Sequence, residues 1–522
     1  MLKKLHGRKL AVCLIGGAMY ALFSAFGWQA EHGGVIWAGG ALLVAALLVW
    51  PIAALLAVLL ERGYTRALRR EKTFRAGRAF AFILACYVPM FCVAFPGSFA
   101  YDVPYQLRQV VTGAYSTHHP LLHTLALGGL LQLGRALGDI NLGAALYTVL
   151  QMALLAGCFA LTCGSIARQS GARAAKRAAV FFALYPLNMV MAVNATKDVL
   201  FGGFFALTLA LLNEIQEKPS RGLALKIAAC GALAVMLRNN MAYAALVWLA
   251  ILTIGLRKGE KSAALAMLLA LAVGLCGNAA LKHATRAESG DMSEMLSWPI
   301  QQLARARLYD EERLTDAEKE AIDELMPGEA WACYDPTISD PVKFEFDTQA
   351  FRADVKKYVG VWLSVGKKCA GTYLDATMAL TYPFFYPYRE YRVSGYYVQM
   401  GMSDAYDAGW CDFDPPESRS LFPRTLASLS WRFGAKGAMQ IPVVGWLFNM
   451  GVIVWTMLFF ALREMYWGRW RRFGTALLPV LLWGTFLLGP VMAGRYIYPF
   501  VCALPVLAAR PGRSVKEAAR HG

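Results

Sequence analysis

The chain has 522 residues, of which 57% are hydrophobic and only 17% are charged, and its mean hydropathy is +0.41. About a quarter of the residues of a soluble globular protein are charged, and several apolar runs here are long enough to cross roughly 30 Å of hydrocarbon. These two properties exclude a soluble repeat protein.

The net charge of +17 would suit a nucleic-acid-binding protein, but its distribution argues against that class. Residues 282–436 carry 24 acidic and 18 basic side chains, whereas the rest of the chain carries 11 acidic and 34 basic ones. The basic excess lies in short loops between apolar segments, which is typical of the cytoplasmic loops of membrane proteins.

The apolar segments predict an all-α polytopic membrane protein with about twelve transmembrane helices. We interpret the first segment as a retained helix rather than a signal peptide, because another segment of membrane length soon follows it. Twelve spans place the loops rich in Lys and Arg on the cytoplasmic side, together with both termini. The expected spans are residues 10–26, 35–60, 79–95, 141–166, 178–194, 199–215, 222–237, 241–256, 262–281, 440–462, 474–493 and 496–510.

This topology divides the chain into three regions. Residues 1–281 form a transmembrane region of nine spans, whose first long external loop is 95–141. Residues 282–436 form a helical non-cytoplasmic domain inserted before the last three spans, and 437–522 hold those spans and a short cytoplasmic tail. Within the domain we expect a helix at 315–325 and an amphipathic helix pair at 351–380, broken near Gly366. Its three cysteines, at positions 333, 369 and 411, allow one disulfide whose partners are left open.

In the first external loop, Asp102 is the only acidic residue in a long apolar neighbourhood. Pro104 predicts that a helix begins here, with Gln106 one turn beyond Asp102 on the same face. Asp102 is therefore either a helix cap or a functional acid, and the residue chemistry favours neither.

Three of the seven histidines of the chain follow closely, at His118, His119 and His123. Histidines in such a cluster can bind a metal or hydrogen-bond a phosphate, and we place phosphate or substrate contact above metal because no acidic ligand pattern accompanies them. For any one histidine, an interfacial ring that is satisfied by backbone carbonyls is the more common situation.

Further cations lie at the outer ends of later spans. Lys197 and Asp198 separate two spans, and a local ion pair between them is the simplest interpretation. Arg238, followed by Asn239 and Asn240, ends the seventh span, and Arg495 with Tyr496 joins the last two. A single Arg at a membrane surface can be accounted for by its long side chain reaching water. Widely separated loops that all bring charge to one leaflet are better explained by a functional site.

An acid among several cations suits chemistry on a lipid phosphate. The carboxylate can act as a general base on an acceptor hydroxyl, and Arg and Lys can stabilise the charge that develops on a departing phosphate. A donor with a polyprenyl tail would enter sideways from the bilayer, and the external domain would hold the acceptor.

The order of these features resembles the GT-C class of integral-membrane glycosyltransferases, and more closely an uncharacterised bacterial branch of that class, over residues 80–505. The matching stretches are Phe95-Pro96-Gly97 with Asp102 and Gln106, His118-His119-Pro120 with His123-Thr124, Lys197-Asp198-Val199-Leu200-Phe201, Arg238-Asn239-Asn240, Ser297-Trp298-Pro299 with Gln301-Gln302, and Gly494-Arg495-Tyr496 with Pro499.

The resemblance implies a GT-C-like fold and transfer of a sugar from a polyprenyl-phosphate donor to a glycan, lipid or protein acceptor of the cell envelope. It makes Asp102 the catalytic base, and it makes Asp198 a second acid or the residue that orients Lys197. The implied donor or phosphate contacts are His118, His119, Lys197, Arg238 and Arg495, and the supporting residues are Gln106, Asn239, Asn240 and Tyr496. Some GT-C enzymes use a divalent metal; the first loop has no acidic pair, so no metal site is assigned here and the cofactor is left open.

Two other functions fit the same spans. A transporter or lipid flippase would place polar groups near the middle of the bilayer and toward both sides. A non-catalytic scaffold for envelope assembly would use the external domain for binding and would need no path from Asp102 to the lipid.

Overall fold

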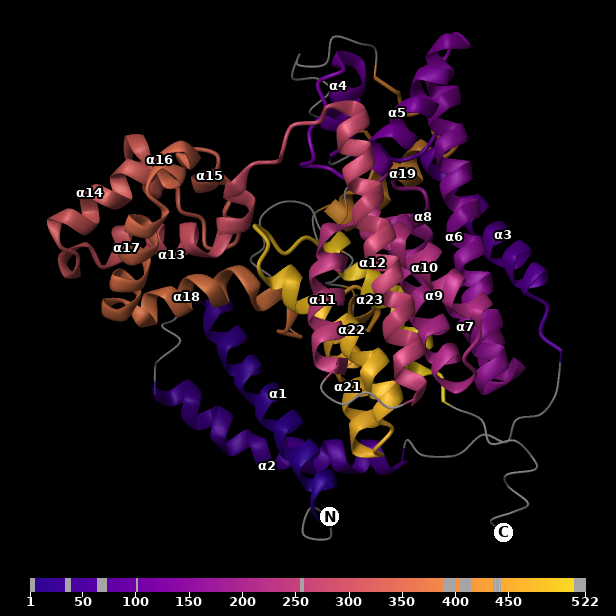
Figure 1. The fold of residues 1–522 in the computed structure, drawn as a ribbon, viewed down its shortest axis with the longest axis horizontal. Coiled ribbons are helices and arrows are strands. Elements are labelled where there is room, and N and C mark those ends of the chain that lie inside the picture. Colours follow the sequence, from indigo (N-terminus) through magenta and orange to yellow (C-terminus); the bar gives the residue numbers. More distant parts are fainter. Residues whose placement is uncertain are drawn as a thin grey trace.

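The computed structural model describes residues 5–32, 39–62, 73–99, 102–253, 258–387, 398, 400–402, 415–434, 437, 441 and 443–510. Within these residues the regular structure is helical, and the remaining backbone pairing consists of isolated β-bridges (Figure 1). This confirms the all-α fold class. Cys411 lies outside the described residues, while Cys333 and Cys369 are free thiols.

Helices overlap each of the twelve expected spans. They are α1 (Arg8–His32), α2 (Gly39–Arg62), α3 (Ala76–Ala94), α6 (Ile140–Ser170), α7 (Ala172–Leu184) with α8 (Pro186–Ala192), α9 (Lys197–Glu217), α10 (Arg221–Leu237), α11 (Asn239–Thr253), α12 (Lys258–Thr285), α21 (Met450–Tyr466), α22 (Trp470–Leu487) and α23 (Tyr498–Ala508).

Six of these helices, within the part of the chain that the structure describes, are long and apolar enough to cross a membrane: α1, α2, α3, α6, α9 and α12. Together with the shorter apolar helices at Asn239–Leu252 and Gly494–Ala508, they make the chain a multi-pass membrane protein.

Two expected spans differ from the structure. The span 178–194 is two helices, because Pro186 lacks an N–H and biases Tyr185 toward extended backbone, so α7 ends at Leu184. The span expected from residue 440 begins instead at Met450, where the Asn449 side chain accepts a hydrogen bond from the Val452 N–H and caps α21.

The two long loops between the expected spans, residues 95–141 and 282–436, hold the remaining helices. The first loop contains α4 (Val103–Thr112) and α5 (Leu121–Ala136), which lie at the end of the bundle opposite to the start of α1 (Figure 1). The second contains α13 (Ser297–Tyr309), α14 (Asp316–Leu325), α15 (Asp340–Lys343), α16 (Thr348–Ala353), α17 (Val355–Lys368), α18 (Ala370–Thr381) and α19 (Pro423–Gly434). Short 3-10 turns lie before or between these helices: η2 (Met292–Leu296), η3 (Glu311–Arg313), η4 (Pro327–Cys333) and η5 (Tyr382–Phe384). Two further turns lie outside this loop: η7 (Val444–Leu447) precedes α21, and η8 (Gly494–Ile497) precedes α23.

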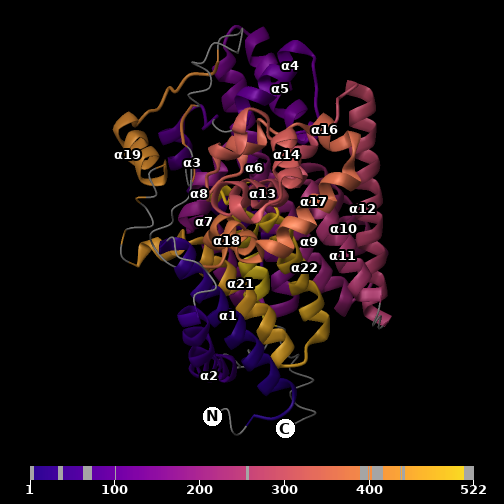
Figure 2. The same ribbon diagram turned by 90° about the vertical axis from the view of Figure 1, so that its left-hand side faces the viewer.

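Helices α13 to α18 form a lobe at the side of the bundle (Figure 1). The lobe has its own apolar core, which includes Ile300, Ile322 and Val365. Its local structure follows the sequence: the expected helix at 315–325 begins in a capping box between Thr315 and Glu318, and the expected pair at 351–380 is α17 and α18. Helix α19 lies apart from the lobe, beside α3 (Figure 2), where the N–H of Leu421 donates to the Cys92 carbonyl.

The contact between α5 and α6 holds the loop of residues 95–141 against the bundle. A Cβ at Gly134 would lie 2.3 Å from the Gly143 nitrogen, and one at Gly143 would lie 2.3 Å from the Leu130 carbonyl oxygen. These glycines let the two backbones touch, as small residues do at helix crossings in membranes. The contact fixes α5, and α4 packs on α5 through Gly128 and Val110.

Substituting Gly143→Ala should therefore lower the free energy of unfolding by about 1–3 kcal/mol, because the added methyl group overpacks a backbone contact. Gly129→Ala is the matched control on α5, since nothing lies within 4 Å of a Cβ there. Thermal unfolding in detergent measures both variants. Equal melting temperatures for Gly143→Ala and the wild type would contradict this packing.

Candidate active site

Asp102 is the centre of a cluster of charged side chains contributed by four separate loops. It occupies the N-cap position of α4, yet its side chain makes no capping hydrogen bond. The carboxylate instead accepts hydrogen bonds from Lys197 Nζ at 2.9 Å and from Arg495 Nη1 and Nη2 at 3.1 and 3.3 Å. Its side chain is 23% exposed, so it remains open on one side. Of the two interpretations of Asp102, the helix cap is not formed, because the side chain makes no capping hydrogen bond.

Lys197 and Asp198 begin α9 but point to different partners. Lys197 reaches Asp102, whereas Asp198 is completely buried and forms an ion pair with Arg238. The Nε atom of Arg495 lies 3.9 Å from Asp198 Oδ2, so Arg495 stands between the two carboxylates. The local Lys197–Asp198 ion pair is absent from the described contacts, because the helix start directs consecutive side chains to different faces.

Aromatic rings hold the two arginines in place. The Arg238 guanidinium lies 4.4 Å from the ring centroid of Phe486 and 4.6 Å from that of Tyr496, and Arg495 lies 5.3 Å from the Tyr496 ring. Contacts of this kind are worth more when the cation is removed from water, as it is here. Phe486 is a contributor that sequence reasoning missed, because a Phe in an apolar span gives no functional signal.

The histidines of the first loop divide by burial. His119 is buried, with Nδ1 3.4 Å from Lys197 Nζ and 3.7 Å from Asp102 Oδ2, while His118 is exposed and packs edge-on against the His119 ring. Lysine can only donate, so Nδ1 of His119 accepts from Lys197 and the ring proton is on Nε2. His123 is buried away from the charged cluster and binds Gln106.

Burial alone would raise the pKa of Asp102, but the charges of Arg495 and Lys197 outweigh it and hold this pKa well below its usual value. Burial lowers the pKa of His119 well below its usual value, despite the nearby Asp102. His119 is thus neutral and Asp102 is ionised. The cations of the cluster, Lys197, Arg238 and Arg495, therefore exceed its two carboxylates, those of Asp102 and Asp198, by one positive charge.

Three predicted supporting residues lie outside this cluster. Gln106 hydrogen-bonds His123 and Thr124 at 2.9 Å. Asn240 donates to the Thr485 hydroxyl at 3.2 Å and links α11 to α22, and Asn239 is exposed. The fourth, Tyr496, lies between the arginines and is part of the site.

The lobe of helices α13 to α18 contacts the loop that carries Arg495. Trp298 Nε1 donates to the Leu487 carbonyl at 2.6 Å, and the Ser339 N–H donates to the Pro490 carbonyl at 2.9 Å. An isolated bridge between Ile338 and Val491 completes this contact. The lobe and the charged cluster are therefore joined through residues 487–495.

The side chains present do not fit a divalent metal. Each carboxylate is already engaged by an ammonium or guanidinium group, and no group of three His, Cys, Asp or Glu side chains converges among the described residues. Mg²⁺ and Ca²⁺ take several oxygen ligands, and cations next to those oxygens would repel them. We assign no step to a metal.

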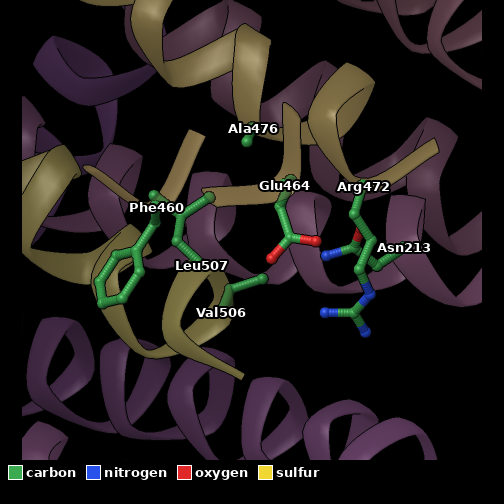
Figure 3. Close-up of a pocket in the computed structure, with 7 residues that line it drawn as sticks. All are labelled: Asn213, Phe460, Glu464, Arg472, Ala476, Val506 and Leu507. Atoms are coloured by element: carbon green, nitrogen blue, oxygen red, sulfur yellow. The ribbon is translucent and has the colours of Figure 1, made fainter. Parts of the chain in front are cut away.

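A second cluster of polar side chains lies at the C-terminal end of α9, opposite to the end that carries Lys197 and Asp198. Glu464 and Arg472 line a small pocket there with Asn213, between the ends of α9, α21, α22 and α23 (Figure 3). Glu464 accepts hydrogen bonds from Arg463, and Arg472 donates to the Gln169 side chain. The stretch of α9 between the two polar ends, residues 199–212, has Thr208 as its one polar side chain and covers about 21 Å.

Replacing Arg238 with Met should lower the free energy of unfolding by about 3–5 kcal/mol, because it leaves the buried Asp198 carboxylate without its main partner. The double variant Arg238→Met/Asp198→Asn should recover part of this loss. Arg419→Met is the control, since it removes an exposed pair with Asp139, and such pairs contribute about 0–1 kcal/mol. Chemical unfolding in detergent measures all three, and similar losses for Arg238→Met and Arg419→Met would contradict the buried pair.

Comparison with known proteins gives a family and one structural likeness. The model of a family of unknown function, DUF6020, matches residues 111–521. No curated protein matches the sequence. Among solved structures, the chain is similar to ArnT from Cupriavidus metallidurans in its crystal structure bound to undecaprenyl phosphate, with 12% identity, a TM-score of 0.31, and coverage of 83% of this chain and 78% of that chain. Because the family model spans more than half of its residues, the protein belongs to the family of unknown function DUF6020.

Proposed function

We propose that the protein is a membrane glycosyltransferase that moves a sugar from a polyprenyl-phosphate donor to an acceptor of the cell envelope on the non-cytoplasmic face. The observation that carries this proposal is the Asp102 carboxylate held by Lys197 and Arg495, in a cluster with one surplus positive charge. The order of sequence features that resembles the GT-C class supports the same activity.

The surplus charge suits one phosphodiester. Lys197 has three N–H donors and Arg495 has five, so both can bind phosphate oxygens while they keep a contact to Asp102. His119, with its proton on Nε2, offers a further donor, and the exposed His118 lies beside it. Arg238 stabilises the cluster indirectly, because it neutralises the Asp198 carboxylate.

The reaction is a single displacement at the anomeric carbon. Asp102 takes the proton of the acceptor hydroxyl as the acceptor oxygen forms its bond to that carbon. The bond from the carbon to the phosphate oxygen breaks, and its electron pair leaves with the polyprenyl phosphate, whose charge Lys197 and Arg495 stabilise. Configuration at the sugar carbon is inverted.

Binding of the donor also makes Asp102 a stronger base. In the free protein, both cations are bound to Asp102 and make it a weak base. A phosphate that draws Lys197 and Arg495 toward its own oxygens adds negative charge near Asp102, which raises the pKa of the carboxyl group. The base thus gains strength only when the donor is in place.

A transporter is less well supported by the arrangement of polar side chains. The alternative requires polar groups along the path across the bilayer, but the central, buried α9 carries an apolar stretch of about 21 Å between its two polar ends. The scaffold alternative gives no reason to bury two carboxylates and three cations together, which is costly in the absence of function.

The proposed function predicts sugar release from lipid-linked donors. Purified protein in lipid should transfer sugar from at least one radiolabelled polyprenyl-phosphate sugar to an envelope extract, and it should not use a nucleotide sugar. A panel of both donor types tests this. Absence of transfer from every donor, accompanied by movement of labelled lipid or solute across liposomes, would favour the transporter instead.

The pH dependence should differ between the free and the donor-bound enzyme. Asp102 acts only when it is deprotonated, so kcat/KM should show no acid limb from this group above about pH 4. Because bound phosphate raises the pKa of Asp102, the acid limb of kcat should lie at higher pH than that of kcat/KM. Steady-state kinetics across pH measures both limbs, and coincident limbs would contradict the proposed competition for Lys197 and Arg495.

A further inference from the structure

Four buried polar side chains form a continuous row beside the charged cluster without belonging to it. They are Gln106 on α4, His123 on α5, and Tyr147 and Gln151 on α6, each no more than 4% exposed. Gln106 Nε2 lies 2.9 Å from His123 Nδ1, the Tyr147 hydroxyl lies 2.9 Å from His123 Nε2, and that hydroxyl lies 3.0 Å from Gln151 Oε1. The row thus crosses three helices.

The direction of every hydrogen bond in this row follows from its last member. Gln151 Nε2 lies 3.0 and 2.9 Å from the carbonyl oxygens of Ala192 and Asn194, which can only accept, so the amide nitrogen must face them. Gln151 Oε1 then faces Tyr147 and accepts from its hydroxyl. The Tyr147 oxygen is left to accept from His123, so the ring proton of His123 is on Nε2.

The same reasoning fixes the orientation of the Gln106 amide, the first member of the row. With its proton on Nε2, His123 has a bare Nδ1 that must accept from the Gln106 amide. The second amide proton of Gln106 goes to the Thr124 hydroxyl at 2.9 Å, which donates in turn to the Pro120 carbonyl at 3.3 Å. Each donor in the row has one acceptor, and a proton added to His123 would have none.

The row is connected at one end to Asp102 and at the other end to the loop that carries Lys197. Gln106 lies one turn after Asp102 on α4, and its N–H donates to the Asp102 carbonyl at 3.0 Å. At the other end, the Asn194 carbonyl belongs to the loop that leads into Lys197 and Asp198. That loop is also paired with Ser98, whose carbonyl accepts from the Ala195 N–H at 2.8 Å.

We infer that Gln106, His123, Tyr147 and Gln151 form a one-way hydrogen-bond chain that fixes the position of the Lys197 loop relative to the Asp102 helix, with His123 as a positioning residue in one neutral tautomer. This role replaces the phosphate or metal contact expected of His123 from its place in the histidine cluster. The tautomer follows from the geometry alone, whereas the effect on catalysis rests on the proposed function.

The surroundings of His123 agree with a fixed neutral ring. Burial, and after it the nearby Lys197, lower the pKa of His123 to about 3, although Asp102 opposes them. The hydrogen-bond partners of the ring, Gln106 and Tyr147, are uncharged.

Solid-state ¹⁵N NMR of histidine-labelled protein in liposomes tests the tautomer without any substrate. The His123 signals, identified by their loss in His123→Asn, should show a protonated Nε2 and a bare Nδ1, unchanged between about pH 5 and pH 8. A ring that titrates in this range, or one with its proton on Nδ1, would overturn the chain.

The substitution Tyr147→Phe tests the positioning role, because it removes one hydroxyl from the middle of the chain and keeps the ring. We expect kcat to fall about 10- to 100-fold, as a misplaced catalytic group would cause. Tyr87→Phe is the matched control: Tyr87 is equally buried in a neighbouring helix and donates to the Phe182 carbonyl at 2.8 Å, away from the site. It should lose comparable stability and retain kcat.

The two measurements separate failure of the chain from failure of the proposed function. If Tyr147→Phe retains the wild-type kcat, or if Tyr87→Phe loses as much activity, the positioning role is wrong. If the wild type transfers no sugar, the proposed function has failed. In that case the ¹⁵N spectrum still tests whether the hydrogen-bond chain exists. The measurement that replaces kcat is ³¹P NMR of bound undecaprenyl phosphate, compared between the wild type and Tyr147→Phe. An unchanged ³¹P signal would then overturn the positioning role.

Discussion

The interaction on which the site depends is the contact of one carboxylate, Asp102, with two cations from distant loops. A charge removed from water is tolerated only when partners of opposite sign and hydrogen bonds compensate it. Lys197 comes from the start of α9 and Arg495 from the turn before α23, so neither can reach Asp102 unless both helices are in place. The buried Asp198–Arg238 pair adds the same requirement for α10. The chemistry proposed for the site is thus inseparable from the packing of the bundle.

The surrounding structure supplies what this cluster requires. Glycine contacts between α5 and α6 bring the first external loop down onto the spans, and the hydrogen-bond chain through His123 connects that loop to the one carrying Lys197. From the other side, Trp298 of the external lobe holds the loop that leads to Arg495. A ligand held by the lobe would therefore act on residues that are in contact with Asp102.

Much of this could be predicted from the sequence, because length, hydropathy and charge are local signals. All twelve spans overlap helices, and the start of α4 at Pro104 and the cap at Thr315 follow from residue type. The convergence of Asp102, Lys197, Arg238 and Arg495 was predicted only as a shared membrane face; which acid binds which cation depends on three-dimensional packing. The simplest interpretation of Lys197, a pair with its neighbour Asp198, is not what the structure shows, because Lys197 pairs with Asp102. Phe486, Tyr147 and Gln151 were missed, because apolar or singly polar residues inside spans resemble ordinary core.

The most direct test of the central claim compares sugar transfer by the wild type, Asp102→Asn and Asp139→Asn in the same lipid. Asp139 is a matched external aspartate that caps α6, where Asn is also a good cap, and it makes no contact with the site. The account predicts that Asp102→Asn abolishes transfer while the protein remains folded and that Asp139→Asn retains it. Full transfer by a folded Asp102→Asn protein would contradict the role of Asp102 as the base.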